Sequence, residues 1–405
     1  MAVSRRQCCA GLLGGLGAAF LAACRSGRPR RASASGFSLD GGVALLGTVW
    51  PGGAAEPAAG WVVLLDDRGR IDRMGAVAEV TVPVGVRRIG GPDTWIGPGI
   101  VDAHVHLAFG PAEEGLRGGL VGVRDLGAPP AIAARSRSRG TALPTGRPVV
   151  AVAGPLLTAP GGYPSTTWGR DGFTRAVDSP EAARAAVRAL VADGVDLVKI
   201  ALEPAGGLPV PGPGQVRAVV DAAHAAGLAV TAHALSAEMV TRALDAGVDE
   251  LCHVPDEPLD AALIERIAAS GVPVVSTIQT FFSGGSGGAV AANAAALVAI
   301  GVPLVYGTDL GNAGTRPGVD PRELDRLADA GLGRLGALRA ATVGAAGLLG
   351  DSRVTGALVA GSAPALVVLS ADPLREPSVW RSPLLVLVGG QGTAPDPSAL
   401  AAITR

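Results

Sequence analysis

The chain has 405 residues, a length that fits two or three average domains or one large barrel with an appended lobe. Its 34 basic and 35 acidic residues give a net charge of −1 and form no long run of one sign, which excludes the clustered basic surface of a nucleic-acid-binding protein. Apolar residues make up 48% of the chain and charged residues 17%. A chain of this composition can bury a large core, so we predict a globular protein.

The first residues have the pattern of an export signal. Arg5 and Arg6 precede a Gly- and Ala-rich apolar stretch that ends in Leu-Ala-Ala-Cys at 21–24. A charged start, a short apolar segment and small residues before a cleavage site are typical of a secretory signal, and paired arginines are typical of its twin-arginine form. Because Leu-Ala-Ala-Cys resembles a bacterial lipobox, we expect residues 1–23 to be removed and Cys24 to be lipidated. The protein is then exported to the cell envelope and held at a membrane surface by this lipid anchor, with 24–36 as a tether.

The segments on either side of the central region have a β-type pattern. Residues 37–95 contain short apolar runs separated by Gly and Pro, without a strong helical period, and residues 354–405 repeat this style. Apolar runs bounded by turn residues predict strands. We therefore predict a small composite β-sandwich domain built from 37–95 and 354–405.

Residues 96–353 alternate short β-rich runs with Ala-rich helical segments such as 180–193, 214–226 and 258–270. Strands alternating with helices predict βαβ units and a parallel sheet. Eight such units favour a closed (β/α)₈ TIM-like barrel, so the fold class is α/β. The eight runs are Ile100–Leu107, Leu120–Leu126, Pro148–Leu156, Val195–Leu202, Leu228–Ala234, Val248–Val254, Val272–Ile278 and Pro303–Asp309.

Most of the histidines lie at the ends of these runs. In a parallel barrel the carboxyl ends of the strands meet at one rim, where barrel enzymes place their sites. Imidazoles and carboxylates together suit zinc or a similar divalent ion, so the pattern predicts a metal site. Its candidate ligands are His104 and His106 on one face of the first run, Lys199 in the fourth, His233 in the fifth, His253 in the sixth and Asp309 in the eighth.

Lys199 is the single lysine among the 34 basic residues. An amine can act as a nucleophile whereas a guanidinium cannot, and burial favours the neutral amine. A neutral amine can add carbon dioxide to form a carbamate, whose two oxygens can bridge two cations, as two-metal sites require.

These residues resemble the amidohydrolase superfamily. The resemblance rests on Gly-Pro-Gly-Ile-Val-Asp-Ala-His-Val-His at 97–106, on Lys199, His233 and His253, and on Gly-Thr-Asp at 307–309. The stretches 195–200 and 227–234 resemble the branch related to imidazolonepropionases and prolidase-like metallodipeptidases.

The resemblance implies a metal-dependent hydrolase that cleaves a C–N amide bond of a small molecule with a hydroxide bridging two divalent ions, zinc being the expected metal. It implies that His104, His106 and Asp309 hold one ion and that His233 and His253 hold the other. A carbamate on Lys199, formed from carbon dioxide, bridges both, and Asp309 is the acid and base that moves protons.

Several assignments stay open at this stage. Tyr163 stands where relatives often carry His after Gly161-Gly162 and is a candidate substrate contact. Dipeptides, N-acyl amino acids and cyclic amides are the expected substrates, in that order. The alternatives are a one-metal site with unmodified Lys199, an esterase or lactonase on the same binuclear site, and a non-catalytic lipid-anchored solute-binding protein. The sequence leaves the oligomeric state open, and it predicts that Cys252 faces the helix layer as an inert thiol.

Overall fold

The structure is a computed structural model that describes residues 35–138 and 146–405. The predicted signal peptide and Cys24 lie outside the described residues. The predicted tether ends earlier than expected, because Ser35 and Gly36 already belong to the strand β1 (Ser35–Phe37), which pairs with β18. Among the described residues no helix is both long and apolar enough to cross a membrane.

Strands from both chain ends form one eight-stranded sheet with the order β1-β18-β17-β16-β5-β2-β3-β4. The two ends are joined where β16 pairs antiparallel with β5. The predicted β-sandwich is not confirmed, because all eight strands belong to a single hydrogen-bonded sheet. Besides β1, these strands are β2 (Val43–Val49), β3 (Ala58–Leu65), β4 (Ile71–Ala76), β5 (Arg87–Pro98), β16 (Ala365–Leu369), β17 (Leu385–Val388) and β18 (Gln391–Ala394).

The central region contains eight parallel strands, one inside each run that the sequence singles out. They are β6 (Ile100–Val105), β7 (Leu120–Asp125), β8 (Val149–Val152), β11 (Val198–Leu202), β12 (Val230–Ala234), β13 (Glu250–Leu251), β14 (Val274–Val275) and β15 (Leu304–Val305). Two further strands, β9 (Leu156–Thr158) and β10 (Thr174–Ala176), extend the sheet beside β11.

Hydrogen bonds connect the edges of the two parallel sheets, β6-β7-β8 and β10-β9-β11-β12-β13-β14-β15. The Asp196 amide donates to the Val152 carbonyl at 2.8 Å, and the Ala103 amide donates to the Tyr306 carbonyl at 3.1 Å. This mixed α/β fold with parallel strands is consistent with a TIM-like barrel.

The helices that cover the strands begin and end where the sequence supplies caps. Ser179, Ser236 and Asp260 accept amide hydrogen bonds at the starts of α3, α5 and α6, and left-handed glycines end the same three helices. In chain order the helices are α1 (Ala112–Arg117), α2 (Pro130–Ser136), α3 (Pro180–Asp193), α4 (Pro213–Ala225), α5 (Ala237–Ala246), α6 (Ala261–Ser270), α7 (Ile278–Gly284), α8 (Gly287–Ala299), α9 (Pro321–Leu327), α10 (Gly333–Arg339), α11 (Ala345–Leu349) and α12 (Pro397–Ala402).

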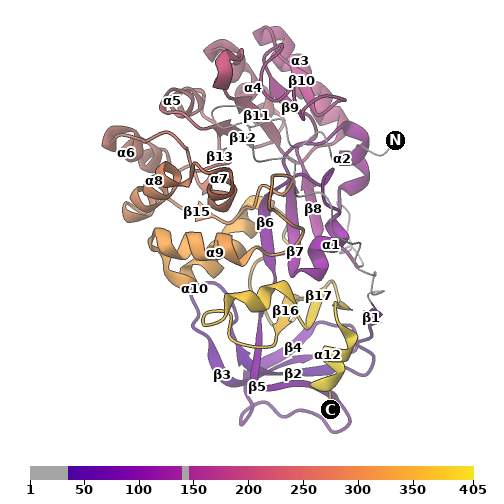
Figure 1. Ribbon diagram of the computed structural model, residues 1–405. Coiled ribbons are helices and arrows are strands. Elements are labelled where there is room, and N and C mark those ends of the chain that lie inside the picture. Colours follow the sequence, from indigo (N-terminus) through magenta and orange to yellow (C-terminus); the bar gives the residue numbers. More distant parts are fainter. Residues whose placement is uncertain (1–34, 139–145) are drawn as a thin grey trace, which may run out of the picture.

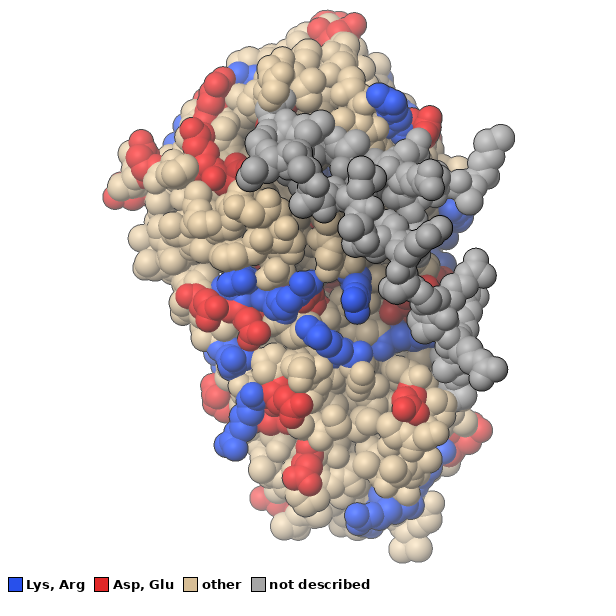
Figure 2. Space-filling view, in the orientation of Figure 1, with Lys and Arg blue, Asp and Glu red and all other residues tan. Residues whose placement is uncertain are grey.

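The β domain lies against one end of the helix-covered region, at the bottom of Figure 1. The chain passes between the two parts where β5 ends at Pro98 and β6 begins at Ile100. Trp50, Trp95 and Trp380 are fully buried and belong to the same core as the barrel strands. Figure 2 shows basic side chains gathered along this junction, while acidic and basic side chains are mixed elsewhere on that face.

Candidate metal centre

All six candidate ligands line one pocket. They come from different elements of the parallel-strand region: His104 from β6, His106 directly after it, Lys199 and His233 from β11 and β12, His253 just after β13, and Asp309 beyond β15. The remaining lining residues are Phe109, Leu156, Tyr163, Trp168, Gly311 and Asn312.

The first group of ligands consists of His104, His106 and Asp309. The Nε2 atoms of both histidines lie 3.3 Å from Oδ1 of Asp309, and one donor atom from each residue lies within 4.8 Å of the others. Nδ1 of His104 is 3.0 Å from the Cys252 carbonyl and Nδ1 of His106 is 3.2 Å from the Gly127 carbonyl. With its proton on Nδ1, each ring donates to the carbonyl and keeps a lone pair on Nε2 facing Asp309, the arrangement common for metal-binding histidines.

Electrostatics favours the neutral imidazole that metal binding needs. Burial, with a smaller contribution from Lys199, lowers the pKa of His104 well below its usual value. Burial and then the neighbouring His233 do the same for the pKa of His253. The donor set therefore fits a divalent cation.

The second group consists of His233, His253 and Lys199. The rings of His233 and His253 are 4.6 Å apart, and His253 is 4.7 Å from His104, so the two groups adjoin. Nδ1 of His253 lies 2.9 Å from Oγ1 of Thr277, while Nε2 of His233 lies 3.2 Å from Oε2 of Glu203. Lys199 is 2% exposed, so its amine is shielded from bulk water and faces the same pocket.

Asp102 fixes the turn that carries Asp309. Its Oδ1 accepts hydrogen bonds from the amides of His104 at 3.1 Å and Thr308 at 3.0 Å, and its Oδ2 accepts from the Thr308 hydroxyl at 2.6 Å. Asp309 itself has φ of 53°, a left-handed conformation that costs a non-glycine residue roughly 1–3 kcal/mol. The Asp102 network connects β6 to this turn and holds the strained backbone in place.

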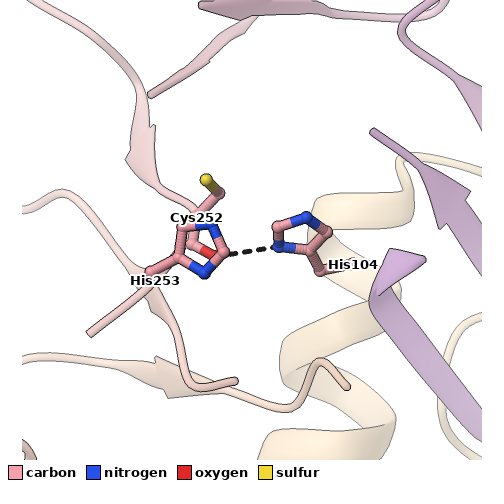
Figure 3. Close-up of side chains that lie close together, drawn as sticks. All are labelled: His104, Cys252 and His253. Atoms are coloured by element: carbon pink, nitrogen blue, oxygen red, sulfur yellow. Dashed lines mark hydrogen bonds between the residues drawn. The ribbon is translucent and has the colours of Figure 1, made fainter. Parts of the chain in front are cut away.

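The predicted orientation of Cys252 toward the helix layer is wrong. Its side chain contacts Nζ of Lys199, and its sulfur belongs to a buried group with His104 and His253. Strand alternation does not apply across Cys252 and His253, because β13 ends at Leu251. Figure 3 shows His104, Cys252 and His253, with the hydrogen bond that Nδ1 of His104 donates to the Cys252 carbonyl. Burial raises the pKa of the Cys252 thiol to about 11.

Two other features of this region are not apparent from the sequence. Arg124 forms a buried, bidentate ion pair with Glu250 at 3.0 and 2.6 Å, which no local spacing indicates because 126 residues separate them. Glu203 directly follows β11. Its position at the carboxyl end of a strand is the sequence signal by which it could have been predicted as a residue of the site.

An aromatic wall, defined here as Phe109, Tyr163, Trp168 and Phe173, borders the metal centre. The predicted substrate contact Tyr163 lies 5.2 Å from the His233 ring, and its oxygen accepts a hydrogen bond from Nε1 of Trp168 at 3.2 Å. The Trp168 ring is 5.0 Å from His106. Phe109 stacks on Phe173 with centroids 5.7 Å apart. Of these four residues, the sequence predicts only Tyr163 as a substrate contact.

Residues 95–392 match the model of the amidohydrolase family, so the chain belongs to this family. It is therefore a hydrolase that acts on carbon–nitrogen bonds, and the family typically uses metal ions. None of the curated proteins searched matches the sequence.

Solved structures share the fold. A Xaa-Pro dipeptidase with methionine in its active site is 22% identical, with a TM-score of 0.73 over 86% of this chain and 98% of the other. A prolidase-like protein of Bifidobacterium longum is 25% identical, with a TM-score of 0.72 over 90% and 98%. Phenylurea hydrolase B is 20% identical, with a TM-score of 0.68 over 89% and 98%.

Proposed function

We propose that the protein hydrolyses the C–N amide bond of a small molecule at a centre of two divalent cations. The observation that carries this proposal is the convergence of four histidines, one aspartate and the only lysine on one pocket. In this assignment His104, His106 and Asp309 would hold one ion and His233 and His253 the other, and a carbamate made on Lys199 from carbon dioxide would supply oxygen ligands to both. Zinc suits this set of nitrogen and oxygen donors.

Two bound cations would activate the attacking water and polarise the scissile carbonyl. The chain's own residues then handle the proton and the substrate. Asp309 accepts a proton from the attacking water and returns it to the leaving nitrogen, because its carboxylate lines the pocket beside the candidate metal ligands His104 and His106. Tyr163 already accepts from Trp168, so its own hydroxyl hydrogen is free to be donated to the substrate.

Two alternatives use the same pocket. An esterase or lactonase differs from an amidohydrolase in the leaving group, since an activated water attacks either carbonyl. Assignment as a lipid-anchored solute-binding protein explains the pocket but does not explain why candidate metal ligands line it. Dipeptide-cleaving structures among the relatives support the amide assignment.

The test is metal content together with turnover. The full chain, produced with zinc and bicarbonate, is expected to hold about two metal ions. We also expect its rate enhancement over the uncatalysed reaction to be larger for members of an amide library than for the matched esters. Lys199→Arg is expected to hold one ion or none and to lose most activity. The matched control is Arg184→Lys at an exposed position of α3, which is expected to keep both the bound metal and the activity. Full activity of Lys199→Arg would refute the carbamate, and two bound ions without turnover of any amide would refute the enzyme.

A further inference from the structure

The pocket outside the six ligands contains no basic side chain among the described residues. Its other walls are apolar or aromatic, with Asn312 as the one polar side chain apart from the Tyr163 hydroxyl and the Trp168 indole. A substrate carboxylate is normally held by a guanidinium or ammonium group through charge-assisted hydrogen bonds. Lys199 is the only cationic residue type there, and the proposed carbamate would remove its charge.

The side of the centre next to His233 is acidic. Oε2 of Glu203 lies 3.2 Å from Nε2 of His233. Asp256 lies on the same side, because its amide donates to the carbonyl of Leu235, two residues after His233, at 3.1 Å. The carboxylates of Glu203 and Asp256 repel an anionic group of a substrate that binds on this side. Burying a substrate carboxylate there without a cationic partner is also costly.

Three rings of the aromatic wall, Phe109, Tyr163 and Trp168, line the pocket, and the buried Phe173 packs against two of them. Trp168 stands edge to face with Phe109 at 6.2 Å, with Phe173 at 5.9 Å and with Tyr163 at 6.3 Å. Its rings come from two segments, one after β6 and one between β9 and β10. An aryl group placed against such rings gains apolar burial and favourable ring–ring geometry.

From these three observations we infer that the substrate is an uncharged amide, carbamate or urea with an aryl group on or next to its scissile nitrogen. Dipeptides and N-acyl amino acids, which the sequence analysis placed first, carry a carboxylate that this pocket has no residue to receive. The inference rests on the proposed amide hydrolysis and names the substrate class of that site.

A matched pair of anilides tests the charge requirement. 4-Acetamidobenzamide and 4-acetamidobenzoate share the acetanilide bond and nearly the same shape, and they differ in one negative charge. Cleavage of that bond is followed as release of acetate and the ring amine, which excludes hydrolysis of the primary carboxamide from the rate. For the zinc-loaded full chain we expect kcat/KM for the carboxamide to exceed that for the carboxylate at least tenfold. A ratio near one, or a preference for the carboxylate, would overturn the inference.

Variants separate charge from stacking. Asp256→Asn is expected to lower the carboxamide-to-carboxylate ratio severalfold, whereas Glu265→Gln on the exposed face of α6 makes the same charge change away from the pocket and leaves the ratio unchanged. Trp168→Ala is expected to raise KM for both anilides at least fivefold. An unaltered KM would refute the role of the wall.

The outcomes distinguish the two proposals. If glycylproline or N-acetylphenylalanine is hydrolysed and both anilides are not, the amidohydrolase stands and the inference on substrate class is wrong. If none of these amides is hydrolysed by protein that holds two zinc ions, the proposed function itself fails, and the inference with it.

Discussion

The ion pair between Arg124 and Glu250 is a buried charged contact between the parallel strands. It joins β7 and β13, strands of two different sheets, through two hydrogen bonds of 3.0 and 2.6 Å. Both side chains are almost completely buried, with 2% and 3% of their area exposed. Nε of Arg124 has no partner among the described residues, so Glu250 is the main compensation for the buried guanidinium.

Glu250→Gln keeps the shape and removes the charge. Breaking a buried pair by neutralising one partner destabilises a protein by about 3–5 kcal/mol, because the other charge is left uncompensated. Unfolding entropy is roughly 2.1 cal/mol/K per residue, or about 0.8 kcal/mol/K for a chain of this length. The expected loss of melting temperature is therefore about 4–6 °C.

Thermal and urea unfolding followed by circular dichroism measure this loss. The control is the double variant Arg124→Met with Glu250→Leu, which removes both charges and is expected to be far less destabilised than the sum of its single variants. A loss below 1 kcal/mol in Glu250→Gln, or strict additivity in the double variant, would show that the pair is not the compensating contact we describe.

Three further predictions concern other parts of the chain. Asp309→Asn is expected to keep most of the bound metal, measured by mass spectrometry of the metal, while kcat falls about 10²–10⁴-fold through loss of proton transfer; unchanged kcat would exclude Asp309 as the acid and base. Burial raises the pKa of Glu323 from 4.5 to about 7, so the folded state binds this proton more tightly than the unfolded state. The free energy of unfolding therefore falls by about 3 kcal/mol as the pH rises from about 4.5 to 7. Glu323→Gln should flatten that fall in unfolding measured at pH 5 and pH 8, and an unchanged slope would contradict it. Cys24→Ser is expected to move the protein from the membrane fraction to the soluble fraction of an expressing bacterium, a shift that a protein without a lipid anchor would not show.

The α/β fold with parallel strands could be predicted from the sequence because its signals are local. Each of the eight apolar runs contains a strand, and capping residues such as Ser179 and Gly194 mark helix ends by their own backbone chemistry. The six candidate ligands were found in the same way. Residues at the carboxyl ends of parallel strands meet at one rim whatever the details of packing.

Features that join distant segments were decided by the tertiary structure. The sequence does not show that Arg124 pairs with Glu250, that Trp168 and Phe109 form a wall beside His106, or that both chain ends share one sheet. Cys252 illustrates the reason: its orientation depends on β13 ending at Leu251, and the neighbouring strands determine where that pairing stops. Local pattern fixes which residues form strands and which stand at their ends. The packing of the barrel decides which of those ends face each other, and therefore which substrate the pocket can receive.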